Sequence, residues 1–221
     1  MKKDYSHVCI VLDASGSMNQ IRDDVRGSFN AFLEKQRSAP GKTVFDLFRF
    51  SDETERIVKS VDLSMFHEDL MAQYYCHGCT AMNDAICTAI DTIGREFADM
   101  PEEERPENVL CVIVTDGQEN ASREFTAEDV KTRITRQQEV YNWEFMFLAA
   151  NQDAFATGER MGLVDSQCIR FSLSAEDVDD KFNRVMACRM EVVRSGERLK
   201  NQKPADAKPV PPCRKKKTEK K

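Results

Sequence analysis

Short apolar runs bounded by polar residues recur along the first two hundred residues of the chain. Runs of this kind are typical of strands that are buried inside a sheet. They predict six strands, at His7–Leu12, Val44–Phe50, Glu55–Val61, Val109–Val114, Trp143–Ala150 and Gln167–Phe171. Most of these runs are separated by longer stretches with a different period, which points to helices between the strands.

Apolar residues at helical spacing mark the intervening stretches. They predict helices from Gln20 to about Arg37, from Met82 to Phe97, after Thr126, from about Asp153 to Met161, and from about Ser174 to Lys200. The sequences Thr126–Asp129 and Ser174–Asp177 both resemble capping boxes, in which a hydroxyl and an acid three residues later satisfy the first free N–H groups of a helix.

The lengths of the connections indicate the topology. Only the four residues Ser51–Thr54 separate the second and third strands, which is enough for a hairpin but too short for a parallel crossover. The other strands alternate with helices, a pattern typical of parallel sheets covered on both faces. We therefore expect one doubly wound, Rossmann-like α/β domain over residues 1–200, with a mostly parallel six-stranded sheet and one antiparallel strand.

Charge is distributed unevenly along the chain. Residues 203–221 contain eight basic and two acidic residues, whereas the preceding 202 contain 24 basic and 36 acidic residues. Four of the seven prolines also fall after position 203, so we predict a disordered basic tail at 201–221. The acidic body makes duplex nucleic acid an unsuitable main partner, because Lys and Arg supply most of that affinity. The basic tail could make only weak contacts with nucleic acid, because salt screens the attraction of so few charges.

The remaining composition indicates a cytosolic protein. No stretch approaches the roughly 18 consecutive apolar residues of a membrane span, and the N-terminus lacks the apolar core of a signal peptide. The eight cysteines are expected to be reduced thiols, since a chain of this length does not need a disulfide framework. Cys9, Cys111 and Cys168 lie within apolar strands, where a thiol behaves as a small hydrophobic group.

Three polar segments lie where ligands bind in open α/β sheets, beyond the carboxyl ends of strands. They are Asp13–Ser17 after the first strand, Thr80 before the second long helix, and Thr115–Gly117 after the most apolar strand. All of them offer hard oxygen donors, which suit Mg²⁺ in octahedral coordination. We expect side chains 13, 15 and 17 to face one side of an extended turn, with Gly16 allowing the backbone to fold tightly.

These segments together resemble the metal-ion-dependent adhesion site of von Willebrand factor type A domains. The resemblance rests on Val11–Ser17, on Thr80 within Gly78–Ala85, and on Thr115–Gly117, and it covers about residues 5–195. The chain looks most like small stand-alone members from bacteria and their phages. It departs from the family at Cys79, because the residue before the threonine is commonly glycine.

The resemblance implies a set of roles for five residues. Ser15 and Ser17 would bind the metal directly through their hydroxyls, and Thr80 would do so when the site is engaged. Asp13 and Asp116 would hold the metal directly or through water. The metal would be Mg²⁺, with Mn²⁺ as the alternative, and one coordination position would accept an Asp or Glu side chain of a partner protein. The implied function is therefore protein binding rather than catalysis.

Several other interpretations remain open from the sequence. Ser15 and Ser17 could serve only as helix caps. A metal-dependent phosphoesterase or hydrolase would use Asp13, although no general base is evident and His7 is expected at the opposite end of its strand. A structural assembly subunit would leave the metal site unused.

The segment before Thr80 has its own alternatives. Cys76 and Cys79, with His77, have the spacing of a zinc or redox pair, but a zinc site needs a further donor, so ordinary thiols are favoured. Tyr74 and Tyr75 form either an exposed recognition edge or packing beneath the loop.

Overall fold

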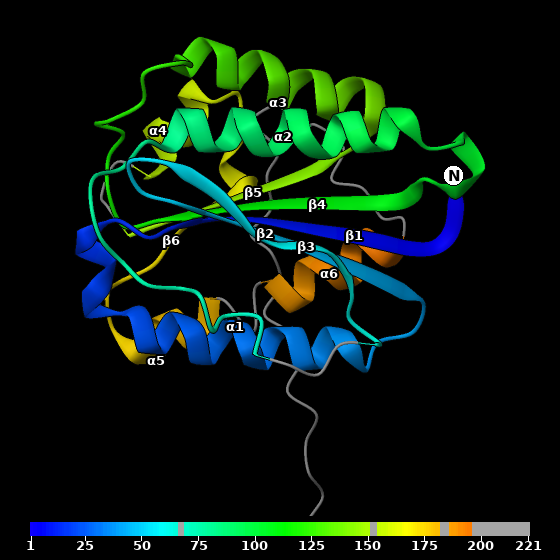
Figure 1. Cartoon of the computed structure of the whole chain (residues 1–221), viewed down its shortest axis with the longest axis horizontal. Helices are drawn as coiled ribbons and strands as arrows, with labels where there is room; N and C mark the ends of the chain where they lie inside the picture. Colours follow the sequence, from blue (N-terminus) through cyan, green and yellow to red (C-terminus); the bar gives the residue numbers. More distant parts are fainter. Residues whose placement is uncertain (66–68, 151–153, 182–185, 196–221) are drawn as a thin grey trace, which may run out of the picture.

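A six-stranded sheet runs through the middle of the protein, with helices on both of its faces (Figure 1). The computed structural model describes residues 1–65, 69–150, 154–181 and 186–195. The strands are β1 (Lys2–Asp13), β2 (Lys42–Phe50), β3 (Thr54–Asp62), β4 (Pro106–Thr115), β5 (Glu144–Ala149) and β6 (Cys168–Arg170). All six predicted strands are therefore confirmed, and β1 begins five residues earlier than its apolar run.

The strand order is β3-β2-β1-β4-β5-β6. Every neighbouring pair is parallel except β2 and β3, which are antiparallel. The hairpin predicted from the four-residue link is thus confirmed, as is the doubly wound α/β fold. The winding direction changes between β1 and β4, so the carboxyl ends of these two strands form the switch point at which such sheets bind ligands.

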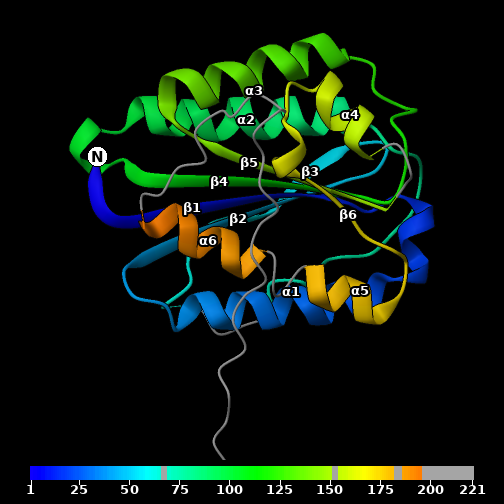
Figure 2. The same cartoon turned by 180° about the vertical axis from the view of Figure 1, so that it is seen from behind.

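Helices cover the two faces of the sheet in two groups (Figures 1 and 2). One face carries α2 (Met82–Asp99), α3 (Ala127–Tyr141) and α4 (Ala154–Arg160), and the other carries α1 (Arg22–Arg37), α5 (Ala175–Asp179) and α6 (Met186–Ser195). Short 3-10 turns occur at Gly16–Gln20 (η1), Glu102–Glu104 (η2) and Asp165–Gln167 (η3). None of the described helices is long and apolar enough to cross a membrane.

Side chains along each central strand alternate between two apolar cores. In β1, Val8, Ile10 and Leu12 face the core beneath α1, whereas Cys9 and Val11 face the core beneath α2 and α3. Cys111 and Cys168 also lie in the second core, so these thiols pack as apolar groups, as predicted. A strand buried on both faces explains why its sequence is continuously apolar.

The helix expected from Ser174 to Lys200 is described only in part. Its described residues form α5 and α6, and residues 182–185 and 196–200 lie outside the described residues, so a single continuous helix stays a prediction. The predicted tail at 201–221 also lies outside them.

Only one of the two predicted capping boxes is complete. At α3, the Thr126 hydroxyl accepts from the Asp129 N–H, and the Asp129 carboxylate accepts from the Thr126 N–H. At α5, Ser174 caps the helix, but the carboxylate of Asp177 accepts from the N–H of Ser172 instead. The segment before α5 turns back toward the helix, so the Ser172 N–H takes the place of the Ser174 N–H as donor to the Asp177 carboxylate.

Candidate metal centre

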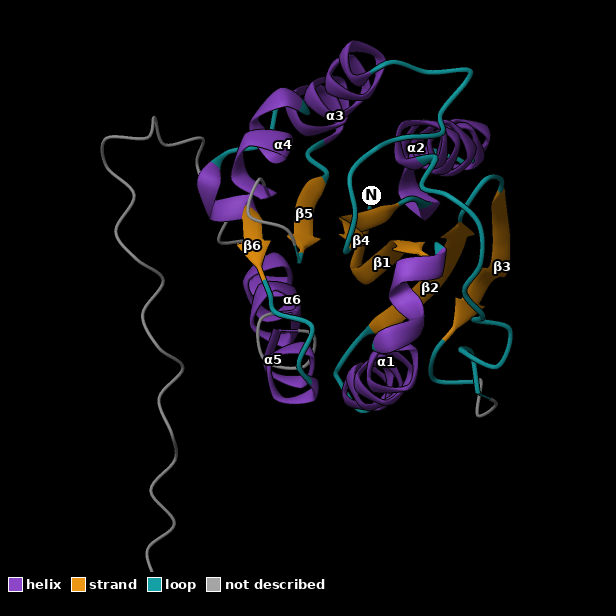
Figure 3. Cartoon of the chain, turned by 90° about the vertical axis from the view of Figure 1, so that its left-hand side faces the viewer, coloured by secondary structure: helices purple, strands orange, loops and turns teal. Residues whose placement is uncertain are grey.

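The loop that follows β1 contains three of the predicted ligands. Figure 3 views the end of the sheet at which β1 and β4 finish. Asp13, the last residue of β1, is fully buried, and its Oδ1 accepts a 2.7 Å hydrogen bond from the Ser15 N–H. The hydroxyl oxygens of Ser15 and Ser17 lie 3.1 Å apart. The three side chains therefore converge, as predicted.

The local backbone reaches this arrangement differently from the prediction. Ser15 is extended, but Gly16–Gln20 form a 3-10 turn, so alternation along an extended chain does not bring the hydroxyls together. A Cβ on Gly16 would make only an ordinary 3.6 Å contact with the Gly78 carbonyl oxygen. The tight fold at Gly16 therefore does not draw on the conformational freedom of glycine, since a 3-10 turn is open to other residues.

The central strand β4 contributes the second carboxylate. Ser17 donates a 2.7 Å hydrogen bond to Oδ1 of Asp116, 99 positions away in the sequence. Neighbouring oxygens around an octahedral Mg²⁺ ion with bonds of about 2.0–2.1 Å lie about 2.9 Å apart. The contacts from Ser15 to Ser17 and from Ser17 to Asp116 therefore have the spacing of adjacent ligands.

Both carboxylates lie in surroundings that disfavour their charge. Burial raises the pKa of Asp13 to about 6, although hydrogen bonds from Thr115 and Ser15 favour the ionised form. Burial also raises the pKa of Asp116, against the effect of its hydrogen bond from Ser17. A cation beside these groups would offset the cost of keeping two charged carboxylates close together.

Thr80 completes the predicted set at the start of α2. It is only 3% exposed, and a Cβ built on Gly117 would lie 3.4 Å from its Oγ1. The side chain of Thr80 thus lies against the turn that carries Asp116. The structure brings all five predicted residues to one place, which we call the metal centre: Asp13, Ser15, Ser17, Thr80 and Asp116.

The donor set of the metal centre fits a hard divalent cation. It offers three hydroxyls and two carboxylates, and Mg²⁺ typically binds through a few such groups while retaining several waters. The described residues contain no group of three or more His, Cys, Asp and Glu side chains placed to hold a metal ion, and the metal centre itself has only two such side chains. Cys76 and Cys79 are free thiols in the structure.

Residues 74–80, the threonine loop, are tied to the loop after β1. His77 donates its N–H to the Ala14 carbonyl, and Gly78 accepts from the Gly16 N–H. The Tyr74 hydroxyl donates to the carbonyl of Asp13, so Tyr74 packs beneath the loop. Tyr75 is 50% exposed and stacks on the Arg49 guanidinium, so packing beneath the loop is confirmed for Tyr74 alone, and a recognition role for Tyr75 stays a prediction.

Two residues that support the metal centre were not singled out from the sequence. The Thr115 hydroxyl donates a 2.5 Å hydrogen bond to Oδ2 of Asp13 and so connects the ends of β4 and β1. Asn120 accepts from the Thr80 N–H through its Oδ1 at 2.9 Å. Thr115 lies in the Thr115–Gly117 segment and Asn120 lies just after it. Their closeness to Asp116 in the sequence was the only feature that could have predicted a role for them.

Most of the chain matches the model of one protein family. A model of the von Willebrand factor type A domain matches residues 7–184, which includes all five residues of the metal centre. No curated protein sequence gives a significant match.

Solved structures with the same fold are distant in sequence. Proximal thread matrix protein 1 from the mussel byssus is 13% identical, with a TM-score of 0.58 over 89% of this chain and 47% of that chain. Another structure of that protein has zinc in its MIDAS motif. The PilB minor pilin from Streptococcus sanguinis is 11% identical, with a TM-score of 0.59 over 86% of this chain and 62% of that chain. A von Willebrand factor type A protein from Catenulispora acidiphila is 12% identical, with a TM-score of 0.57 over 84% of this chain and 42% of that chain. The chain thus spans about half of the length of these proteins.

Proposed function

Because the chain belongs to the von Willebrand factor type A domain family, whose members are metal-dependent protein-interaction modules, we propose that it binds a partner protein through its metal centre. In this proposal, Asp13, Ser15, Ser17, Thr80 and Asp116 hold Mg²⁺ or Mn²⁺. The partner contributes an Asp or Glu carboxylate. The protein works in the cytosol, which agrees with six described cysteines that are all free thiols.

The observation that carries the proposal is the convergence of the Ser15, Ser17 and Asp116 oxygens. The chain of 3.1 Å and 2.7 Å contacts joins the end of β1 to the end of β4. Helix capping by the serines would not require the carboxylate of Asp116 at this position. Capping is further disfavoured because neither the 3-10 turn nor α1 begins with a side-chain cap hydrogen bond.

The charge of the metal centre favours binding an anion. Asp13 and Asp116 together balance the charge of one divalent cation, which when bound supplies Lewis acidity and an exchangeable coordination position. The cation together with these two carboxylates is nearly neutral, so a further carboxylate that approaches the open coordination position is not repelled. The hydroxyl ligands add no charge and therefore do not oppose the incoming group.

We propose binding rather than hydrolysis because, among the described residues, neither His7 nor His77 is paired with a carboxylate of the metal centre. Nε2 of His7 lies 2.9 Å from the carboxylate of Asp46, in the interior of β1. The ring of His77 stacks on Tyr75. A hydrolase using Asp13 would need a general base close to the reacting water.

A capture experiment in extracts of the native host tests the proposal. Purified protein is immobilised, and partners are retained in Mg²⁺ or in excess chelator and identified by mass spectrometry. We expect Asp116→Ala and chelator to abolish capture of the same partner, because each removes the cation. Circular dichroism checks that the variant keeps its fold.

Two results would contradict the proposal. Equal capture in chelator, or capture that survives loss of the metal-centre side chains, would favour an assembly subunit whose contacts ignore the metal. Metal-dependent hydrolysis of a generic phosphoester, lost in Asp13→Ala, would favour the hydrolase.

A further inference from the structure

A small groove lies between the start of α2, the loop after β4 and the end of α4. It encloses about 210 Å³, and its polar lining comes from Asn83, Gln118, Glu119, Thr157 and Arg160. Sites for small organic ligands usually enclose about 300–1,000 Å³. The groove is therefore the right size for a single side chain rather than for a cofactor or metabolite.

Chain connectivity places the groove beside the metal centre. Gln118 is two residues beyond Asp116, and two residues span at most about 7 Å. Asn83 lies three residues beyond Thr80, in the first turn of α2, and its N–H donates to Oε2 of Glu119 at 2.8 Å. The same two segments that carry Thr80 and Asp116 thus continue directly into the wall of the groove.

The groove is lined by one cationic side chain, Arg160, and one acidic side chain, Glu119. The exposed Arg160 contacts only the Ala156 carbonyl and the Thr157 hydroxyl, and it has no ion pair among the described residues. Glu119 also lines the groove, but its carboxylate already accepts four hydrogen bonds. The donors are the N–H groups of Asn83, Ala121 and Ser122 and the Ser122 hydroxyl. Arg160 is therefore the group left to bind an anion.

We propose that this groove is a second anionic subsite, in which Arg160 binds a second carboxylate of the same partner segment. The inference rests on the proposed function, since the first carboxylate is the one received at the metal centre. In an extended peptide, side chains two positions apart face the same way and lie about 6.6–6.8 Å apart. The partner segment in this proposal is extended and carries acidic residues at positions i and i+2, the spacing that the peptides below test.

Three blocked five-residue peptides test this subsite. The first carries aspartates at its second and fourth positions, separated by glycine, and the second has asparagine in place of the later aspartate. The third carries aspartates at its second and third positions, which keeps the net charge but places the side chains on opposite faces. Binding to the full chain is followed by NMR titration in Mg²⁺ and in chelator, since weak affinities are expected.

We expect the wild-type protein to bind the first peptide about two- to fivefold more tightly than the other two, the size of one exposed ion pair. Arg160→Gln should remove this preference, whereas Arg136→Gln, which makes the same charge change at an exposed position outside the groove, should keep it. Affinity for Mn²⁺ alone, measured by electron paramagnetic resonance, should be equal in the two variants.

The outcomes separate the subsite from the proposed function. Metal-dependent binding without preference among the peptides, or with a preference that survives Arg160→Gln, overturns the subsite and leaves the function standing. Binding of the first peptide that persists in chelator and is lost in Arg160→Gln supports the subsite and overturns the metal-dependent function. No binding of any peptide in Mg²⁺ overturns both.

Discussion

Asn120 and Thr80 form a reciprocal pair of hydrogen bonds beside the metal centre. The Thr80 N–H donates to Oδ1 of Asn120 at 2.9 Å, and the Asn120 N–H donates to the Thr80 carbonyl at 3.1 Å. The side-chain bond orients the segment that presents the Thr80 hydroxyl. Groups that orient metal ligands commonly change metal affinity by 10- to 100-fold when they are removed.

We predict that Asn120→Ala lowers Mn²⁺ affinity about tenfold, and that it has no further effect once Thr80 is already alanine. Isothermal titration of the two single variants and the double variant measures this. Ser122→Ala is the control, because its hydroxyl bonds the Asp84 N–H in the same loop without contacting Thr80. Additive effects of the two substitutions would show that Asn120 does not act through Thr80.

Gly78 has a conformation that the threonine loop requires. Its φ is +73°, and a Cβ there would lie 1.9 Å from Oδ2 of Asp52. We expect Gly78→Ala to lower the free energy of unfolding by more than about 1 kcal/mol, because the loop must move. In Gly27→Ala, within α1, nothing lies within 4 Å of the added Cβ, so we expect a gain of about 0.5–1 kcal/mol. Urea denaturation compares the two, and a loss equal to or smaller than about 0.5 kcal/mol in Gly78→Ala would contradict the prediction.

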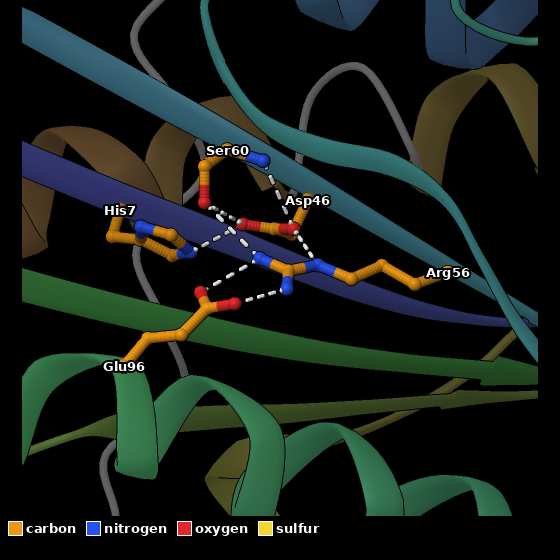
Figure 4. Close-up of polar contacts among 5 residues, drawn as sticks. All are labelled: His7, Asp46, Arg56, Ser60 and Glu96. Atoms are coloured by element: carbon orange, nitrogen blue, oxygen red, sulfur yellow. Dashed lines mark hydrogen bonds and ion pairs between the residues drawn. The ribbon is translucent and has the colours of Figure 1, made fainter.

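At the scale of elements, a buried network of charged side chains fastens the edge strand β3 to its neighbours (Figure 4). Arg56 of β3 donates to Asp46 of β2 at 2.5 Å and to Glu96 of α2 at 2.8 Å. His7 of β1 contacts the other oxygen of Asp46, which is fully buried. Three strands therefore meet at the Asp46 carboxylate, and Arg56 connects them to α2 through Glu96.

This network should make stability depend on pH. Burial alone would raise the pKa of Asp46, but hydrogen bonds from His7 and Arg56 outweigh it and hold the pKa below its ordinary value. The native state thus binds fewer protons than the unfolded state around pH 4. The stabilisation is complete above the unfolded pKa of about 3.9 and is lost as pH falls through the lower native value.

We predict that Asp46→Asn costs about 1–3 kcal/mol at neutral pH, because Arg56 loses its buried acceptor and keeps only Glu96. It should also flatten the fall in stability below about pH 4. Denaturation at several pH values measures both effects, with Asp99→Asn, an exposed residue at the end of α2, as control. An equally steep acid dependence in Asp46→Asn would refute this assignment.

For the whole molecule, the metal centre joins strands that are distant in sequence, so the bound cation should stabilise the fold. A cation at 100 times its dissociation constant adds about 2.7 kcal/mol. In a domain of this size, this should raise Tm by about 5–10 °C. Thermal melts in Mg²⁺ and in chelator measure the shift. Asp116→Ala should abolish it and Asp99→Ala should not; an unchanged wild-type Tm would argue against metal binding.

Much of this architecture was determined by local sequence. Burial on both faces makes β1 and β4 continuously apolar, and the four residues Ser51–Thr54 can only form a hairpin. The five residues of the metal centre were identifiable because strand ends expose polar turns, and their order matches a known family. The strands and the hairpin depend on residues close together in the chain, and so the sequence alone reveals them; the site residues, which are far apart in the chain, were recognised only through their places at strand ends and their order.

The remaining features arise only when the chain is packed. The neighbouring position of β1 and β4 brings Ser17 to 2.7 Å from Asp116, and a 3-10 turn rather than an extended one presents Ser15 and Ser17. Likewise, nothing in the pattern around Asp46 indicates that Arg56 will reach it. Strand order and the pairing of buried charges follow from how helices pack on the sheet, which is a sum of long-range contacts that no local pattern contains.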